Sequence, residues 1–279
     1  MMKLFIQKFA ANFKPTFWSK YCQTELAKDL VIANWCDYKF EEEIQHGKRL
    51  EIPGAVRPTV KTYTEGQDIE IETLGDTVVY LDIEYRDYFA FYVDDVEKAQ
   101  SKPGYLDTQF DEAKKSLAEK EDATVGKVAA TGAASDMIVT GGEITEANCL
   151  SVIDEALVLL YKNNVSTKEE LAADLTPEHI VACRNKLASL FSENVEYIKR
   201  GAVGKYNQTY LRLTNNLYND NTNVHELVRT KKAVAVANQI DKVETCRKER
   251  GFGNIVKGLN VYGVKVVRPR ELAVIKVSA

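Results

Sequence analysis

The segment from residue 44 to residue 75 most constrains the fold, because it is strand-like yet too charged to form a core of its own. Turn signals at Pro53-Gly54 and at Glu65-Gly66 interrupt it. Between Ile69 and Glu72, apolar and charged residues alternate, as they do in an exposed strand. Because an isolated two-stranded hairpin is only marginally stable in water, this extended β-hairpin loop is predicted to lie on its own domain or on a neighbouring subunit.

If a neighbouring subunit supplies that surface, the charged side chains of the loop would form ion pairs between subunits. The candidate inter-subunit contacts in this region are Lys48, Arg49, Arg57, Lys61, Glu65, Asp68, Glu70 and Glu72. An exposed ion pair contributes only about 0–1 kcal/mol, so such pairs would matter through repetition across many copies of the chain.

The N-terminal residues carry phenylalanine at every fourth position: Phe5, Phe9, Phe13 and Phe17. This spacing gives one apolar stripe of an amphipathic helix. Lysines interrupt the stretch, so neither a signal peptide nor a membrane span is predicted. Residues 1–43 are therefore expected to form an N-terminal arm and helix that docks on protein through Phe5, Phe9 and Phe13, the alternative being binding to a membrane surface.

A long one-sided helix is predicted after two strands at 77–85 and 88–93, which are rich in β-branched and aromatic residues. Its apolar stripe begins at Leu106 and Phe110 and continues through Val125 and Val128. A helix with one apolar face requires a partner surface, and the preceding strands are the expected one.

The second half of the chain is predicted to mix helices and strands, which makes the fold class α+β. Residues 131–142 are small and glycine-rich, so we interpret them as a linker at a domain boundary. Beyond them we expect helices at 146–162 and 177–191, and strands at 208–214, 233–240, 259–267 and 272–277.

Composition excludes several classes of function. The net charge of −4 disfavours a dedicated DNA-binding protein, whose affinity depends on basic residues, although weak non-specific contact with DNA stays possible. The five cysteines are scattered without a paired motif, which is typical of a reduced, cytosolic protein. No nucleotide-binding loop or nucleophile motif is present, and the three histidines, His46, His179 and His225, are interpreted as surface or interface residues. We therefore predict no catalytic residue, no cofactor and no metal site.

Several short segments resemble, in order, the coat proteins of tailed phages. They are GKRLEIP at 47–53, VKTYTEG at 60–66, YFAFYVDDVEKAQ at 88–100, RKERGFG at 247–253, GLNVYG at 258–263 and VVRP at 266–269. Each segment alone is a weak signal, whereas the ordered set is fairly specific. The resemblance implies the HK97-like capsid fold, which phage coats share with herpesvirus capsid floors and bacterial encapsulins.

The resemblance also implies a division of the chain. It assigns the extended loop to 44–75, a peripheral domain with a long spine helix to 76–134, an axial domain to 135–255, and C-terminal strands returning to the peripheral domain to 256–279. The expected function is a major capsid protein of the virion, made in the host cytoplasm, that assembles with itself into pentamers and hexamers. Scaffolding, portal and decoration proteins and packaged DNA are the expected partners, without a membrane. An encapsulin-like compartment shell and a small enzyme are the alternatives.

Overall fold

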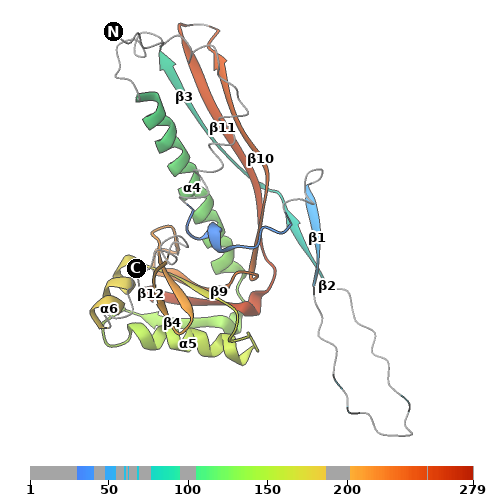
Figure 1. Cartoon of the computed structure of the whole chain (residues 1–279), viewed down its shortest axis with the longest axis vertical. Helices are drawn as coiled ribbons and strands as arrows, with labels where there is room; N and C mark the ends of the chain where they lie inside the picture. Colours follow the sequence, from blue (N-terminus) through green and yellow to red (C-terminus); the bar gives the residue numbers. More distant parts are fainter. Residues whose placement is uncertain are drawn as a thin grey trace, which may run out of the picture.

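The computed structural model describes residues 30–40, 48–54, 60, 62, 68, 77–94, 105–186, 202–249 and 251–278. Within these residues the chain forms two bodies and a projecting hairpin (Figure 1). The first body, which we call the long-sheet body, consists of a three-stranded sheet and the helix α4 (Tyr105–Gly132). The second, the seven-stranded body, consists of a seven-stranded sheet with the helices α5 (Cys149–Lys162) and α6 (Pro177–Lys186).

The long sheet has the antiparallel order β10-β11-β3. Its strands are β3 (Tyr85–Asp94), β10 (Val234–Arg247) and β11 (Gly253–Val266). Helix α4 packs on this sheet, and its Phe110 ring lies edge-on to Phe89 of β3 with the ring centroids 6.0 Å apart. The predicted long helix and its packing on the preceding strand are thus confirmed.

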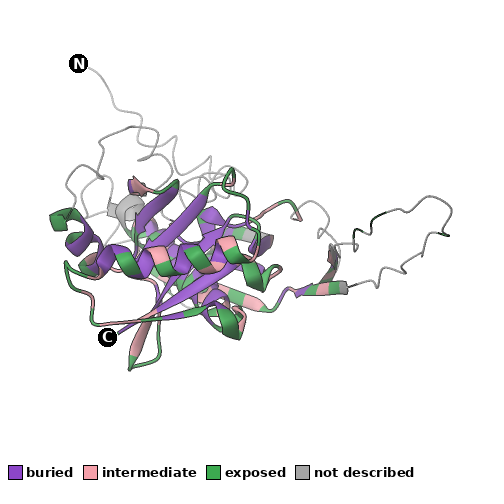
Figure 2. Cartoon of the chain, turned by 90° about the horizontal axis from the view of Figure 1, so that it is seen from below, coloured by how far each residue is buried: buried purple, intermediate pink, exposed green. Residues whose placement is uncertain are grey.

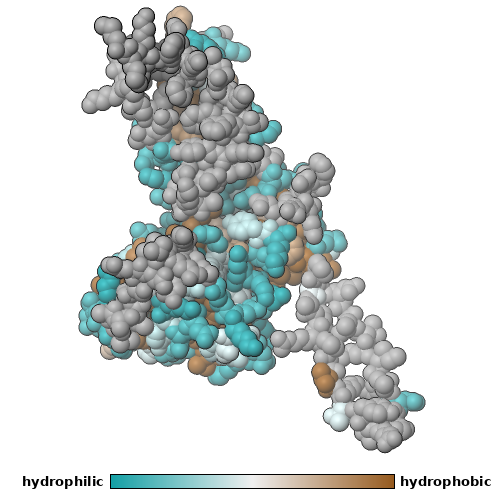
Figure 3. All heavy atoms as spheres, viewed as in Figure 1, coloured by the Kyte–Doolittle hydropathy of each residue, from teal (hydrophilic) through white to brown (hydrophobic). Residues whose placement is uncertain are grey.

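The seven-stranded sheet has the order β4-β12-β9-β5-β7-β6, with β8 paired to β9. The strands are β4 (Ile138–Gly142), β5 (Leu171–Leu175), β6 (Ala202–Tyr206), β7 (Thr209–Leu213), β8 (Tyr218–Asn219), β9 (Asn223–Thr230) and β12 (Leu272–Ser278). Helix α5 buries Ile153, Leu157 and Leu160 in the core of this body. On the face shown in Figure 3 the body is mainly hydrophilic. Val158 and Val181 are among the large apolar side chains of this body that are exposed.

The interpretation of residues 131–142 as a linker is wrong. Thr131 and Gly132 end α4, a short 3-10 turn (Ser135–Met137) follows, and β4 then pairs in parallel with β12. The small residues are there for close packing: a Cβ at Gly141 would lie 3.2 Å from the side chains of both Ile275 and Val152. Glycine content therefore marks a tightly covered edge strand here rather than a flexible connection.

The expected division into domains stays a prediction, and its limits cut across the two larger sheets. Strand β10 lies within the expected axial range 135–255 but belongs to the long sheet, whereas β12 lies within 256–279 and pairs with β4 and β9. The chain leaves the seven-stranded sheet after Thr230, builds the long β10-β11 hairpin, and returns after a 3-10 turn (Pro269–Glu271). Sequence patterns can identify strands, but they do not show to which sheet each strand belongs. The assignment of β10 and β11 to a different sheet from β9 and β12 could therefore not be predicted.

The projecting hairpin pairs β1 (Arg49–Gly54) with β2 (Thr77–Asp82) in antiparallel register. Its root is buried: Ile52, Leu81 and Ile83 form one cluster with Ala235, Ala237 and Val261 of the long sheet. Figure 2 shows this projection beside the purple, buried strands of the seven-stranded body. The root of the predicted loop is therefore anchored on its own subunit. Among the described residues, no helix is long and apolar enough to cross a membrane.

Candidate functional site

The base of the hairpin holds two of the predicted inter-subunit contacts. Arg49 faces Asp82 across the two strands, with Nε 2.6 Å from a carboxylate oxygen, and its guanidinium lies 5.0 Å from the centre of the Tyr80 ring. The hydrogen bond from Arg49 lowers the pKa of the Asp82 carboxyl. Lys48 is exposed, and its carbonyl accepts a hydrogen bond from Ile83 N over 3.0 Å. Arg49 therefore already has an acidic partner within its own chain.

The other candidates are not brought together by the described residues. Asp68 is exposed. Arg57, Lys61, Glu65, Glu70, Glu72, Phe5, Phe9 and Phe13 lie outside the described part of the chain. Their inter-subunit role stays a prediction.

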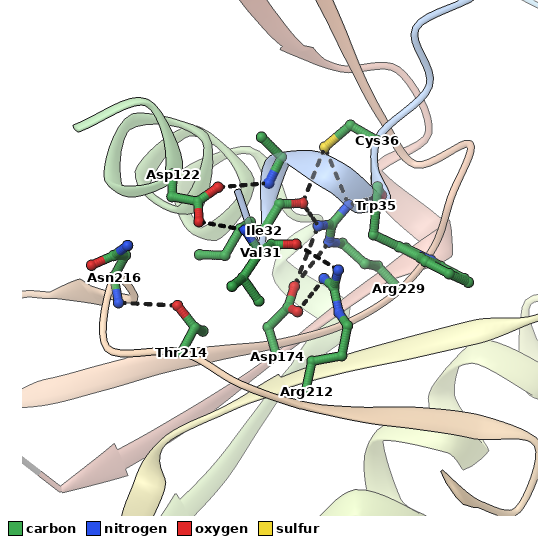
Figure 4. A network of polar contacts seen from close by, with 11 residues as sticks. Val31, Ile32, Trp35, Cys36, Asp122, Asp174, Arg212, Thr214, Asn216 and Arg229 are labelled. Atoms are coloured by element: carbon green, nitrogen blue, oxygen red, sulfur yellow. Dashed lines mark hydrogen bonds and ion pairs between the residues drawn. The ribbon is translucent and has the colours of Figure 1, made fainter. Parts of the chain in front are cut away.

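A buried cluster of charges, which the sequence analysis did not identify, holds residues 30–37 between α4 and the seven-stranded sheet (Figure 4). We call residues 30–37 the junction segment. Asp174 of β5 forms ion pairs with Arg212 of β7 and with Arg229 of β9, the latter at 3.3 Å between Nη2 and Oδ2. All three side chains are at most 1% exposed.

The two guanidinium groups then donate to the main chain of the junction segment. Arg212 Nη1 donates to the carbonyl of Val31 over 2.6 Å, and Arg229 donates to the carbonyls of Ile32 over 2.6 Å and Trp35 over 2.5 Å. Arginine stays protonated in proteins, and a buried charge is costly unless it is fully paired. The junction segment therefore supplies acceptors that Asp174 alone does not provide.

Helix α4 holds the same segment from the opposite side. The carboxylate of Asp122 accepts hydrogen bonds from Val31 N over 2.7 Å and from Ala33 N over 2.9 Å. Burial raises the pKa of Asp122, and these backbone hydrogen bonds oppose the rise. Asp37 then adds a backbone bridge to Ala235 of β10. The junction segment thus joins both bodies through hydrogen bonds with groups far away in the sequence.

A second buried pair links α6 to β9 within the seven-stranded body. His179 Nδ1 lies 2.6 Å from Glu226 Oε2, and its Nε2 lies 2.9 Å from the carbonyl oxygen of Cys149. Thr176 donates to the other oxygen of Glu226 through its N–H over 2.8 Å and through its hydroxyl over 2.7 Å. The interpretation of His179 as a surface or interface residue is therefore wrong, since its side chain is fully buried in its own subunit.

The His179–Glu226 pair has a structural role. Among the described residues, no group of three or more His, Cys, Asp or Glu side chains could hold a metal ion. His179 and Glu226 form a hydrogen bond with each other, and they also bond to the carbonyl of Cys149 and to Thr176. The pair therefore holds α6 on the sheet. Cys36, Cys149, Cys183 and Cys246 are free thiols.

Comparison with known proteins rests on solved structures, because no family model and no curated protein matches the sequence. A structure from Mycobacterium phage Che8 matches with a TM-score of 0.71 and 25% identity, covering 88% of this chain and 90% of that chain. The capsid of cyanophage P-SCSP1u matches with a TM-score of 0.68 and 16% identity, covering 84% of each chain.

A structure of a different kind of shell also matches, but over less of the chain. An encapsulin complex from Synechococcus elongatus has a TM-score of 0.53 and 14% identity, covering 73% of this chain and 76% of that chain. The phage structures therefore share more of the arrangement described above. The phage matches cover most of each chain, and the chain has the HK97-like fold of tailed-phage major capsid proteins.

Proposed function

We propose that this chain is a major capsid protein whose copies assemble into the icosahedral shell that encloses the genome of a tailed phage. The observation that carries the proposal is the match to a phage structure over 88% of this chain and 90% of that chain. A match that leaves so little of either chain unaccounted for fits a subunit with the same task. The role is structural, and we assign no catalytic residue and no cofactor.

The two bodies receive different positions in this proposal. The long-sheet body with α4 is the peripheral domain, and the seven-stranded body is the axial domain near the centre of pentamers and hexamers. The buried junction supports this division, because Asp122 on one side and Asp174 on the other hold the same segment. A fixed angle between the bodies lets many identical copies meet at repeated interfaces.

In the same assembly, the hairpin would contact a neighbouring subunit. Its root is buried against Ala235, Ala237 and Val261. The loop at 44–75 would then extend from this root onto a neighbouring subunit. Scaffolding, portal and decoration proteins are proposed as further partners, and packaged DNA as a weak, non-specific one that salt would release.

Electron microscopy of the purified full-length chain tests the proposal, alone and after co-expression with a scaffolding protein from the same genome. We expect closed shells of uniform diameter, with pentamers and hexamers as their building units. A chain that stays a folded monomer under every assembly condition would contradict the capsid role.

The contents of the shell distinguish the capsid from the encapsulin-like alternative. Particles isolated from the natural source should contain double-stranded DNA if the chain is a phage capsid protein. A compartment shell would instead contain a cargo enzyme and no genome. The genes that flank the coding sequence provide an independent check, since terminase and portal genes accompany a capsid gene.

A further inference from the structure

Two buried cysteines lie where α6 packs on the start of α5. Cys149 is the first residue of α5, and Cys183 lies in the second half of α6. Both side chains are fully buried, and both belong to the hydrophobic core of the seven-stranded body. Both are free thiols, and neither takes part in the His179–Glu226 pair through its sulfur.

Contacts on both sides of Cys183 hold it against the start of α5. His179, four residues earlier on α6, has its Nε2 2.9 Å from the carbonyl oxygen of Cys149. Lys186, three residues later on α6, donates to the carbonyl of Ala147 over 2.8 Å. Residues three or four apart lie on the same face of a helix, so Cys183 faces the start of α5 between these two contacts.

The two thiols are direct neighbours in the core. Burial raises the pKa of Cys183 to about 12, and the charge of Cys149 and its hydrogen bond with the Cys183 thiol add to the rise. A thiol that stays protonated reacts slowly, so the pair persists in the reduced form until it meets an oxidant. The sulfur atoms of a disulfide lie about 2 Å apart, and neighbouring thiols can approach this distance by rotating their side chains.

We propose that Cys149 and Cys183 form a redox site that closes to a disulfide when the subunit meets a peroxide. One thiol attacks the peroxide, the O–O bond breaks and a water molecule leaves, so that its sulfur becomes a sulfenic acid. The other thiol then attacks this sulfur, the S–S bond forms, and the sulfenic oxygen leaves as a second water molecule. The two thiols together lose two electrons and two protons, and the peroxide takes up both.

The bond would fix the second half of α6. The His179–Glu226 pair already holds the first half of this short helix on the sheet. A link from Cys183 to Cys149 would close the intervening segment into a covalent loop, which restricts the unfolded chain and stabilises the folded one. This inference concerns the single subunit and goes beyond the proposed shell role.

Peroxide oxidation of the full-length, unassembled chain tests the proposal. The protein carries Cys22→Ser and Cys246→Ser, which remove two other thiols, the second of them exposed. After treatment with hydrogen peroxide, we expect peptide mass spectrometry to find one intrachain link between Cys149 and Cys183. The midpoint of thermal unfolding should rise by about 5 °C, and dithiothreitol should reverse both changes.

Cys183→Ala in the same background is the matched control, because it keeps Cys149 and removes the pair. Its midpoint should show no rise that dithiothreitol reverses, and Cys149→Ala provides the same control if the first variant does not fold by circular dichroism.

Thiols that stay reduced in the folded chain, under conditions that oxidise Cys246 of the natural sequence, would overturn the proposal. A link to Cys36, a link between two chains, a link that forms only in urea, or a link that lowers the midpoint would overturn it as well. Because the measurement uses unassembled subunits, it can fail while shells still form, and it can succeed if they do not.

Discussion

Arg212 donates a hydrogen bond to the backbone carbonyl of Val31, 181 residues earlier in the chain, across a distance of 2.6 Å. The same guanidinium pairs with Asp174 in the neighbouring strand β5. A charge in the centre of a sheet is thus satisfied partly by a segment that is not part of the sheet. Loss of that segment would leave donors without acceptors, so the fold of the seven-stranded body and the position of the junction segment are coupled.

Replacing Arg212 by methionine should destabilise the subunit by about 3–5 kcal/mol, because Asp174 and the Val31 carbonyl lose a buried partner. Urea unfolding of the unassembled chain, followed by circular dichroism, measures the change. Arg49→Met is the matched control, since it breaks an exposed ion pair and should shift the midpoint little. Similar shifts for the two variants would show that the junction does not hold the bodies together.

The His179–Glu226 pair predicts a pH dependence of stability. Burial lowers the pKa of His179, but the hydrogen bond and the charge of Glu226 outweigh it, so the net direction is upward. A raised folded pKa means that the stabilisation is fully present below the unfolded value of about 6.5 and is lost as the pH rises through the folded value.

The free energy of unfolding of the natural chain should therefore fall between about pH 6.5 and the folded pKa, relative to His179→Gln. Urea titrations of both proteins at a series of pH values supply the comparison. If the difference between the two proteins stays constant with pH, the histidine does not gain a proton on folding and the assigned pairing is wrong.

Gly258 of β11 lies where only a hydrogen atom fits beside the Phe89 ring. A Cβ at this position would lie 2.3 Å from the nearest ring carbon, Cε1. Gly258→Ala should therefore destabilise the subunit by about 1–3 kcal/mol through overpacking. The pair Gly258→Ala with Phe89→Leu should be more stable than the sum of the two single changes predicts, because the smaller side chain relieves the clash. Strict additivity in thermal unfolding would argue against this contact.

The elements with strong periodicity could be predicted from sequence, whereas the junction could not. The stripe of α4 and the strand before Thr214 have clear patterns, and the structure confirms both. Asp174 and Arg212 appear in the sequence as single charges inside short, largely apolar strands, whereas Arg229 lies in a strand that also carries Glu226. A charge inside an apolar strand indicates burial with a partner. Here the partners include the backbone carbonyls of Val31, Ile32 and Trp35, which come near only when the chain has folded. The same limit applies to β4, whose small residues resemble a linker until its neighbours are known.

Reversing a charge in the extended loop tests whether the loop contacts a neighbouring subunit. Lys61→Glu should weaken assembly while leaving the subunit folded, because the loop is proposed to contact a neighbour and each contact is repeated around the shell. Lys168→Glu is the matched control, with the same charge change at an exposed position in the seven-stranded body. Light scattering during assembly measures the first effect, and circular dichroism checks the fold. Hydrogen exchange then compares the monomer with the shell: residues 55–75, beyond the root that is buried on its own subunit, should gain protection only in the shell, because a strand pair with few apolar residues is marginal until it lies on a partner. Equal protection in both states would place the loop on its own subunit and remove its proposed role in the lattice.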